Sequence, residues 1–182
     1  MAAVVWTLYV GLFVWNWLRV RRWRRERGER REGRTTDPGS MRGLVLQGVG
    51  LACAAIPVGS SRGVAEVLAL LSLTAGLLLA WAALTHLGDQ WRVNAVVTED
   101  HRLVTSGPYR VVRHPIYTSL LAMVAGTGLL VTSWVLLAAA LLFYAAGTEI
   151  RVRSEDALLA SHFGAEHEAW RRRTKTWIPW VH

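Results

Sequence analysis

The sequence predicts an all-α integral membrane protein with about five transmembrane helices. Composition is the first indication, because 52% of the 182 residues are hydrophobic, ten are Trp, and the mean hydropathy is positive. The second is the arrangement of the apolar residues, which form long runs rather than short alternating segments. The third is charge, because nearly all basic residues lie between these runs. We therefore expect one compact membrane domain.

Four apolar runs define the predicted helices, and they span Ala2–Leu18, Gly43–Val58, Val67–Leu84 and Ile116–Thr148. The last run has 33 residues. As a single helix it would be roughly 50 Å long, whereas the hydrocarbon core of a bilayer is only ~30 Å thick. Two short helices fit better, and we expect the break near Val131–Trp134. Residues 116–148 then form a helical hairpin, which completes the five helices.

Basic residues test this count, because cytoplasmic loops collect Lys and Arg. Five helices place residues 19–42, 86–114 and 149–182 on one side, and these segments hold ten, four and six of the 21 basic residues. We therefore expect a bacterial or archaeal cell-membrane protein with its N-terminus outside and its C-terminus in the cytosol. Indole rings favour membrane interfaces. The expected inner-interface residues are Trp15, Trp17, Trp91, Trp170, Trp177 and Trp180, and the outer ones are Trp6 and Trp134.

The Arg-rich loop at residues 19–42 suggests a membrane surface as its partner. Residues 19–34 alone carry nine Arg, and the pI near 10.9 would also suit nucleic acid. Basic residues beside a transmembrane helix, however, fix its orientation and contact anionic headgroups. We expect membrane lipids and no nucleic acid as partners. Because there is a single Cys and the six His lack metal-ligand spacing, we predict no metal site.

Two polar segments, His101–Tyr117 and Glu149–Asp156, lie at the two ends of the hairpin. A hairpin that crosses the membrane twice returns both segments to the same side, where they can share one site. Pro115 suits the first turn of a helix, with His114 near the N-cap. The turn at Gly107–Pro108 exposes backbone amides near two Tyr side chains, Tyr109 and Tyr117.

Arg151 and Glu155 stand at i and i+4, and therefore on one helix face. By spacing alone they could be an ordinary exposed ion pair, and His114–Pro115 could be no more than a well-terminated helix. In the closed hairpin, however, a carboxylate and a guanidinium converge on an aromatic loop that is rich in hydrogen-bond donors. This convergence favours a binding site for a small ligand.

Several motifs recur in order across residues 84–180. They are Leu87-Gly-x-x-Trp91, His101-x-Leu-Val-x-x-Gly-Pro-Tyr109-Arg, Arg113-His-Pro-x-Tyr117, Arg151-x-x-x-Glu155, Phe163-Gly-x-Glu166 and Ile178-Pro179. The pattern resembles the isoprenylcysteine carboxyl methyltransferase family, within a wider group that includes phospholipid N-methyltransferases. Four positions depart from it. Ser119 replaces a usual Gly and could tighten helix packing, Asp156 replaces the second Glu of a pair, and His167 and Trp170 replace Tyr.

The resemblance implies a membrane methyltransferase that binds S-adenosyl-L-methionine on the cytosolic side, between the loop before the hairpin and the helix after it. Residues 86–182 would be the cofactor-binding region, and residues 1–85 would provide three membrane spans. The positions implied for the cofactor are Asn94, His101, Arg102, Leu103, Val104, Tyr109, His114, Pro115, Ile116, Tyr117 and Glu155. Arg151 would face the methyl acceptor, so Arg151 and Glu155 are the expected catalytic residues.

The expected acceptor is a lipophilic small molecule or a lipidated substrate, methylated at a carboxylate. A carboxylate needs an orienting cation such as Arg151 but no general base. Phospholipid N-methylation is the alternative, and it would need His114 or Glu155 as a base. From other classes, a nonenzymatic membrane anchor or assembly protein and a nicotinamide-dependent membrane reductase stay open.

Overall fold

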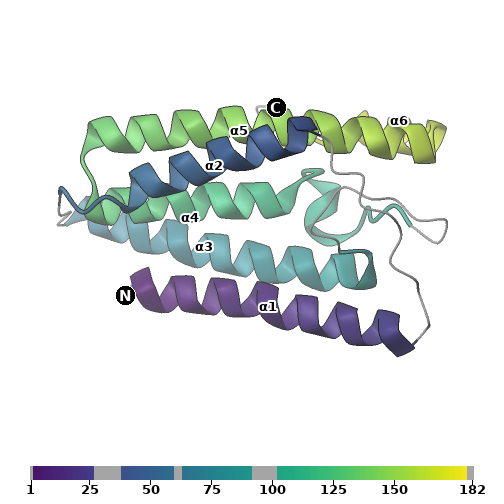
Figure 1. Cartoon of the computed structure of the whole chain (residues 1–182), viewed down its shortest axis with the longest axis horizontal. Helices are drawn as coiled ribbons and strands as arrows, with labels where there is room; N and C mark the ends of the chain where they lie inside the picture. Colours follow the sequence, from purple (N-terminus) through teal and green to yellow (C-terminus); the bar gives the residue numbers. More distant parts are fainter. Residues whose placement is uncertain (1, 27–37, 60–62, 92–101, 180–182) are drawn as a thin grey trace.

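The structure is a computed structural model that describes residues 2–26, 38–59, 63–91 and 102–179. Five long helices lie side by side along the molecule (Figure 1). They are α1 (Ala2–Glu26), α2 (Pro38–Ala55), α3 (Val64–Leu87), α4 (Pro115–Val131) and α5 (Trp134–Phe163), and the shorter α6 (Ala165–Arg171) follows. Two short 3-10 helices, η1 (Gly88–Gln90) and η2 (Gly107–Arg110), lie between α3 and α4 in the chain. The predicted all-α class is confirmed.

The hairpin breaks where the sequence predicts. α4 ends at Val131 and α5 begins at Trp134, and the hydroxyl of the N-cap Ser133 accepts a hydrogen bond from a backbone amide in the first turn of α5. α5 then continues beyond the apolar run and ends before Gly164, whose φ of 49° suits glycine. The second polar segment is therefore the continuation of α5, and it emerges at the end of the bundle where α4 begins (Figure 1).

Three segments of the described residues are long and apolar enough to cross a membrane, namely Ala2–Trp23, Val64–Gln90 and Trp134–Phe163. α4 is also apolar but has only 17 residues, and α2 is not among the three. Large apolar side chains point outward, such as Val135 and Leu142, which are 80% and 70% exposed. Such a surface suits contact with lipid. The total of five membrane spans stays a prediction.

Glycine allows α2 to approach α5 closely. A Cβ placed on Gly50 would lie 2.7 Å from the carbonyl oxygen of Ala140 and 2.8 Å from the amide nitrogen of Tyr144. Towards the polar end of the same helix pair, Gln47 Nε2 donates a hydrogen bond to Thr148 Oγ1 at 2.8 Å. These contacts fix the position of α5 and of the polar residues that follow Thr148.

Replacing Gly50 by alanine is expected to lower the free energy of unfolding by about 1–3 kcal/mol, because the added Cβ meets backbone rather than a flexible side chain. Gly48 on the same helix is the matched control, since a Cβ there meets nothing within 4 Å. Thermal unfolding of Gly48→Ala and Gly50→Ala in the same detergent measures the difference. Equal midpoints would show that α2 and α5 do not pack in this way.

Hydrogen bonds tie α1 to α4. The hydroxyls of Tyr9 and Ser119 are 3.0 Å apart, and Trp6 Nε1 donates to Thr127 Oγ1 at 2.8 Å. Ser119 is fully buried, and a Cβ on Gly76 of α3 would lie only 2.8 Å from its carbonyl oxygen. The Ser119 hydroxyl, which a glycine at this position would lack, therefore links α1 to the α3–α4 pair.

Candidate functional site

The hairpin brings the two polar segments together at one end of the bundle. Tyr117, in the first turn of α4, donates a hydrogen bond through its hydroxyl to Glu155 Oε1 and accepts one from Arg151 Nε at 2.8 Å. The Arg151 guanidinium carbon lies 5.5 Å from the centroid of the Tyr117 ring, and its Nη2 lies 3.6 Å from Glu155 Oε1. The expected convergence of a carboxylate, a guanidinium and an aromatic side chain is therefore found in the structure.

His114 is the N-cap residue of α4 and lies between two carboxylates of α5. Its Nδ1 is 3.4 Å from Glu155 Oε2, and its Nε2 is 3.0 Å from Asp156 Oδ1. Burial alone would lower the pKa of His114, but the hydrogen bonds to Asp156 and Glu155 outweigh burial and raise the pKa to about 9. At neutral pH His114 is therefore an imidazolium that directs one protonated nitrogen at each carboxylate.

Arg113 holds Asp156 from the opposite side. It donates to Asp156 Oδ2 from Nη2 at 3.0 Å and from Nε at 3.3 Å. Its Nη1 donates to the carbonyl oxygen of Thr174 at 3.0 Å, and its Nη2 donates to Thr176 Oγ1 at 3.1 Å. Arg113 is 7% exposed. A single buried guanidinium therefore joins the segment before α4, the polar half of α5 and the chain after α6.

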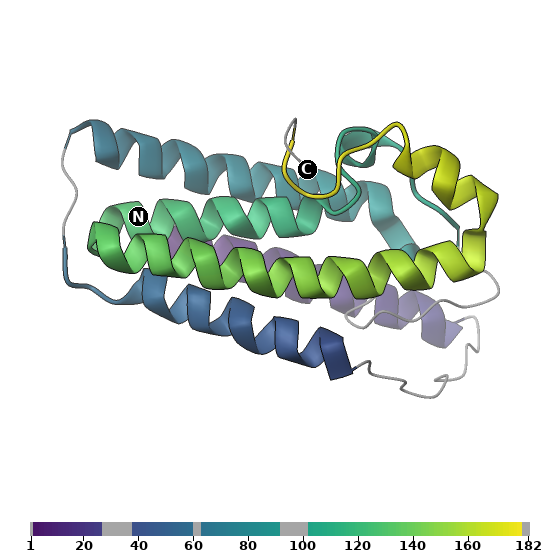
Figure 2. The ribbon, with the colours of Figure 1, turned by 90° about the horizontal axis from the view of Figure 1, so that it is seen from above.

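Residues 172–179, which we name the C-terminal strap, fold back along the segment that precedes α4 (Figure 2). The Arg113 amide donates to the carbonyl oxygen of Lys175 at 2.8 Å, and the His114 amide donates to that of Thr176 at 3.0 Å. These bonds flank an isolated parallel β-bridge between Val112 and Lys175. The strap therefore fixes the backbone of Arg113 and His114, which both contact carboxylates of α5.

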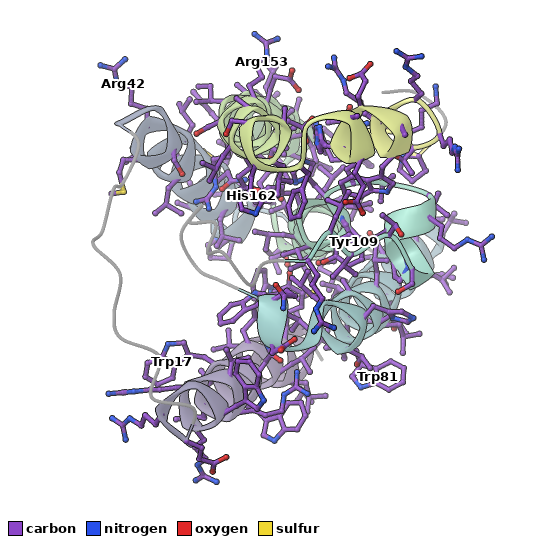
Figure 3. All side chains as sticks on the ribbon, turned by 90° about the vertical axis from the view of Figure 1, so that its right-hand side faces the viewer. Trp17, Arg42, Trp81, Tyr109, Arg153 and His162 are labelled. Atoms are coloured by element: carbon purple, nitrogen blue, oxygen red, sulfur yellow. The ribbon has the colours of Figure 1, made fainter. Side chains whose placement is uncertain are left out.

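The other predicted cofactor residues surround η2 and the start of α4. Pro115 is buried in the first turn of α4, and the exposed Arg102 donates its backbone amide to Gln90 Oε1 at 3.1 Å. A small apolar cluster combines buried Ala83, Tyr109 and Trp170 with half-buried Leu87, Leu103, Val104, Ile116 and Leu159. Figure 3 shows Tyr109 within the molecule, whereas the labelled Arg42, Trp81 and Arg153 point away from it. Asn94 and His101 lie outside the described residues.

Sequence reasoning missed Asp156 and Arg113 as partners of the site. The adjacency of Glu155 and Asp156 could have indicated a shared partner, because consecutive helix residues point about 100° apart and can contact one side chain from two sides. The sequence of the strap has no helix or strand periodicity that would have predicted its position.

Among the residues that the structure describes, no three His, Cys, Asp or Glu side chains are placed to hold a metal ion.

The fold and this polar cluster define an all-helical integral membrane protein whose candidate site lies at the end of a helical hairpin. A model of the isoprenylcysteine carboxyl methyltransferase (ICMT) family matches residues 67–161, just over half of the chain. The chain belongs to this family, as its motifs indicate.

Two curated relatives and one solved structure show the extent of the likeness. Protein-S-isoprenylcysteine O-methyltransferase of Schizosaccharomyces pombe is 35% identical over 86 residues, which are 46% of this chain and 35% of that protein. Cobalt-zinc-cadmium resistance protein CzcN of Cupriavidus metallidurans is 37% identical over 81 residues, 44% of this chain and 37% of that protein. The matched region of this chain therefore covers little more than a third of the length of each relative.

The solved structure is that of the eukaryotic intramembrane Ras methyltransferase ICMT. It aligns with a TM-score of 0.60 at 23% identity, covering 79% of this chain and 51% of that chain. At this identity the likeness establishes the fold. It confirms the all-helical membrane architecture that the apolar runs predict.

Proposed function

We propose that this protein is an S-adenosylmethionine-dependent methyltransferase that transfers a methyl group to the carboxylate of a lipophilic acceptor. The observation that supports it most directly is the cluster of Arg151, Tyr117, Glu155 and His114, which joins the two ends of the hairpin at the edge of the apolar bundle. Family membership supports the same reaction. In this proposal residues 86–182 hold the cofactor, and residues 1–85 supply the membrane frame.

The donor set of the cluster fits the cofactor. Glu155 is a partly buried carboxylate, 21% exposed, that can accept an ammonium group in addition to its present partners. The ring of Tyr117 already lies beside a cation and could face a second one, such as a sulfonium. The apolar cluster around η2 could receive a nucleoside. We assign the cofactor to the described residues Arg102, Leu103, Val104, Tyr109, His114, Pro115, Ile116, Tyr117 and Glu155, and to Asn94 and His101 from their motif positions.

Arg151 is the residue that we assign to the acceptor. When bound, S-adenosylmethionine supplies an already activated methyl group, so the protein needs to align the acceptor and exclude water. Arg151 keeps its charge at any physiological pH and can present two parallel N–H groups to a carboxylate. Because it stands where α5 leaves its apolar half, an acceptor in the lipid could present its carboxylate there while its apolar part stays in the membrane.

Methylation of a phospholipid amine is less well supported. That reaction needs a base to take a proton from the amine. His114 is held as an imidazolium by two carboxylates, because these hydrogen bonds raise its pKa to about 9. Glu155 is already engaged by Tyr117 and His114. A carboxylate acceptor, which needs no base, therefore fits the charges of the cluster better.

A nonenzymatic membrane anchor is the candidate from another class. One observation favours it, because the charged groups of the cluster satisfy one another without a ligand. In that case the cluster would only hold α4, α5 and the strap together. A folded protein that binds no S-adenosylmethionine would support the anchor.

Membranes that carry the protein are expected to transfer labelled methyl from S-adenosylmethionine into a lipid extract, and the label is expected to be released by base. Glu155→Ala should lose the transfer, because the ammonium of the cofactor loses its carboxylate. Arg153→Ala is the matched control, since its side chain is 78% exposed on the same helix. Base-stable label would indicate N-methylation instead. Equal label in the native protein and in Glu155→Ala would contradict an enzyme site at this cluster.

A further inference from the structure

We propose that Asp156 is a positioning residue of the cofactor site, which acts through His114 to fix the Glu155 carboxylate in the orientation that receives the cofactor's ammonium. This inference rests on the proposed function. Asp156 and Glu155 are linked through His114, which contacts both carboxylates. The effect of Asp156 passes through the imidazole ring that lies between the two carboxylates.

The imidazole ring is a rigid link between the two acids. Nε2 of His114 lies 3.0 Å from Asp156 Oδ1, and Nδ1 lies 3.4 Å from Glu155 Oε2. Because the two nitrogens belong to one planar ring, the shorter contact with Asp156 determines where Nδ1 points. The other carboxylate oxygen of Glu155, Oε1, accepts a hydrogen bond from the hydroxyl of Tyr117. Glu155 is therefore held at both oxygens, by Tyr117 and Arg151 at Oε1 and by His114 at Oε2, and Asp156 acts on the contact at Oε2.

Asp156 is itself fixed by groups from outside α5. Arg113 donates two N–H groups to its Oδ2, and Arg113 is in turn bound to the strap at Thr174 and Thr176. The strap also holds the backbone of His114 through the carbonyl oxygen of Thr176. Both ends of the Asp156–His114 contact are therefore anchored to the same short segment, which is what a positioning role requires.

Because each ring nitrogen of His114 faces a carboxylate, the native arrangement requires both ring protons. The groups that face it are Glu155 and Asp156 from α5 and the ring of Tyr117 from α4, with Arg113 beside it in the chain. Beyond Asp156 lies His167 of α6, whose buried Nε2 is 3.7 Å from Asp156 Oδ1 and has no hydrogen-bond partner. Burial lowers the pKa of His167, so His167 stays neutral and leaves the Asp156 charge to Arg113 and His114.

Asp156→Asn tests the role with little change in shape. The asparagine amide can donate a hydrogen bond to Nε2, which favours the neutral imidazole. The pKa of His114 should therefore fall from about 9 in the native protein. Loss of one carboxylate should bring it towards the ordinary value of roughly 6.5. A merely structural contribution of Asp156 would lower stability without weakening cofactor binding by the folded protein.

The experiment combines ¹⁵N-imidazole NMR of the full chain in detergent micelles with binding of S-adenosylhomocysteine, which carries the same ammonium group. The native protein should keep both His114 nitrogens protonated at pH 8, with the signal assigned by its loss in His114→Gln. Asp156→Asn should lose that signature and bind S-adenosylhomocysteine at least about tenfold more weakly at pH 8. Asp156→Glu, which keeps the charge, should retain the signature.

Glu168→Gln is the matched control, because it removes an acid that is 48% exposed at the same end of the molecule. Native binding that persists unchanged in Asp156→Asn would overturn the positioning role and leave the proposed function standing. A neutral His114 in the native protein at pH 8 would also overturn it, even if Asp156→Asn failed to fold. No binding by the native protein would overturn the proposed function and this role together.

Discussion

Replacing Arg113 by alanine is expected to destabilise the site end of the molecule by about 3–5 kcal/mol, because it removes one partner from a buried ion pair. Asp156 loses two hydrogen bonds, and Thr174 and Thr176 of the strap each lose one. The apolar halves of the helices do not depend on Arg113. The strap should therefore detach before the bundle unfolds, and hydrogen exchange at residues 172–179 should accelerate well below the thermal midpoint.

Arg113→Lys should not restore the strap. A lysine ammonium is a single point of charge and cannot reach Asp156 and the Thr174 carbonyl in the geometry of a planar guanidinium. Arg110→Ala is the matched control, because Arg110 is an exposed arginine of η2, three residues away. Hydrogen exchange and thermal unfolding in micelles compare the three variants. Native-like protection of the strap in Arg113→Ala would show that Arg113 does not hold it.

The length of the last apolar run was enough to predict the hairpin. A run of 33 residues fits a bilayer only as two helices, and the polar pair Thr132–Ser133 supplied the break. The even number of crossings then places Arg151 and Glu155 on the same side of the membrane as Tyr117. This part of the site follows from local rules, because it needs only helix periodicity and the thickness of the membrane.

The strap could not be predicted in the same way. Its contacts join residues about 60 positions apart, such as Arg113 with Thr174, and they use one isolated β-bridge rather than a repeating pattern. Trp170 of α6 and Trp177 of the strap show the same limit, although their predicted membrane-interface positions stay predictions. These rings are 8% and 3% exposed, and their indole nitrogens donate to Tyr109 and Glu149 within the protein. Because this burial depends on contacts between residues far apart in the chain, spacing alone could not predict it.

Asp156 was visible in the sequence only as a departure from a family pattern. Its role depends on which residue faces it, and that residue, His114, is 42 positions away. The charge state of His114 depends in turn on both acids, since either carboxylate alone would offset less of the cost of burial. Coupling of this kind is a property of the packed cluster, so residue types and spacing could suggest the members but not their protonation.

Replacing Arg151 is expected to separate acceptor binding from cofactor binding. Arg151→Ala should lower kcat/KM for a carboxylate acceptor about a hundredfold, because the acceptor then lacks its charged partner in a partly dehydrated site. Its side chain is 13% exposed. Affinity for S-adenosylhomocysteine should change far less than methyl transfer, because Glu155 loses the guanidinium 3.6 Å away but keeps its contacts with Tyr117 and His114.

Arg151→Lys decides whether charge alone is sufficient. A lysine keeps the charge but offers no pair of parallel N–H groups, so it should recover only part of the activity towards a carboxylate. Methyl transfer and S-adenosylhomocysteine binding are measured on the same preparations, with the exposed Arg153→Ala as control. If Arg151→Ala weakened cofactor binding as much as it weakened methyl transfer, Arg151 would belong to the cofactor site. The acceptor carboxylate would then need another cation.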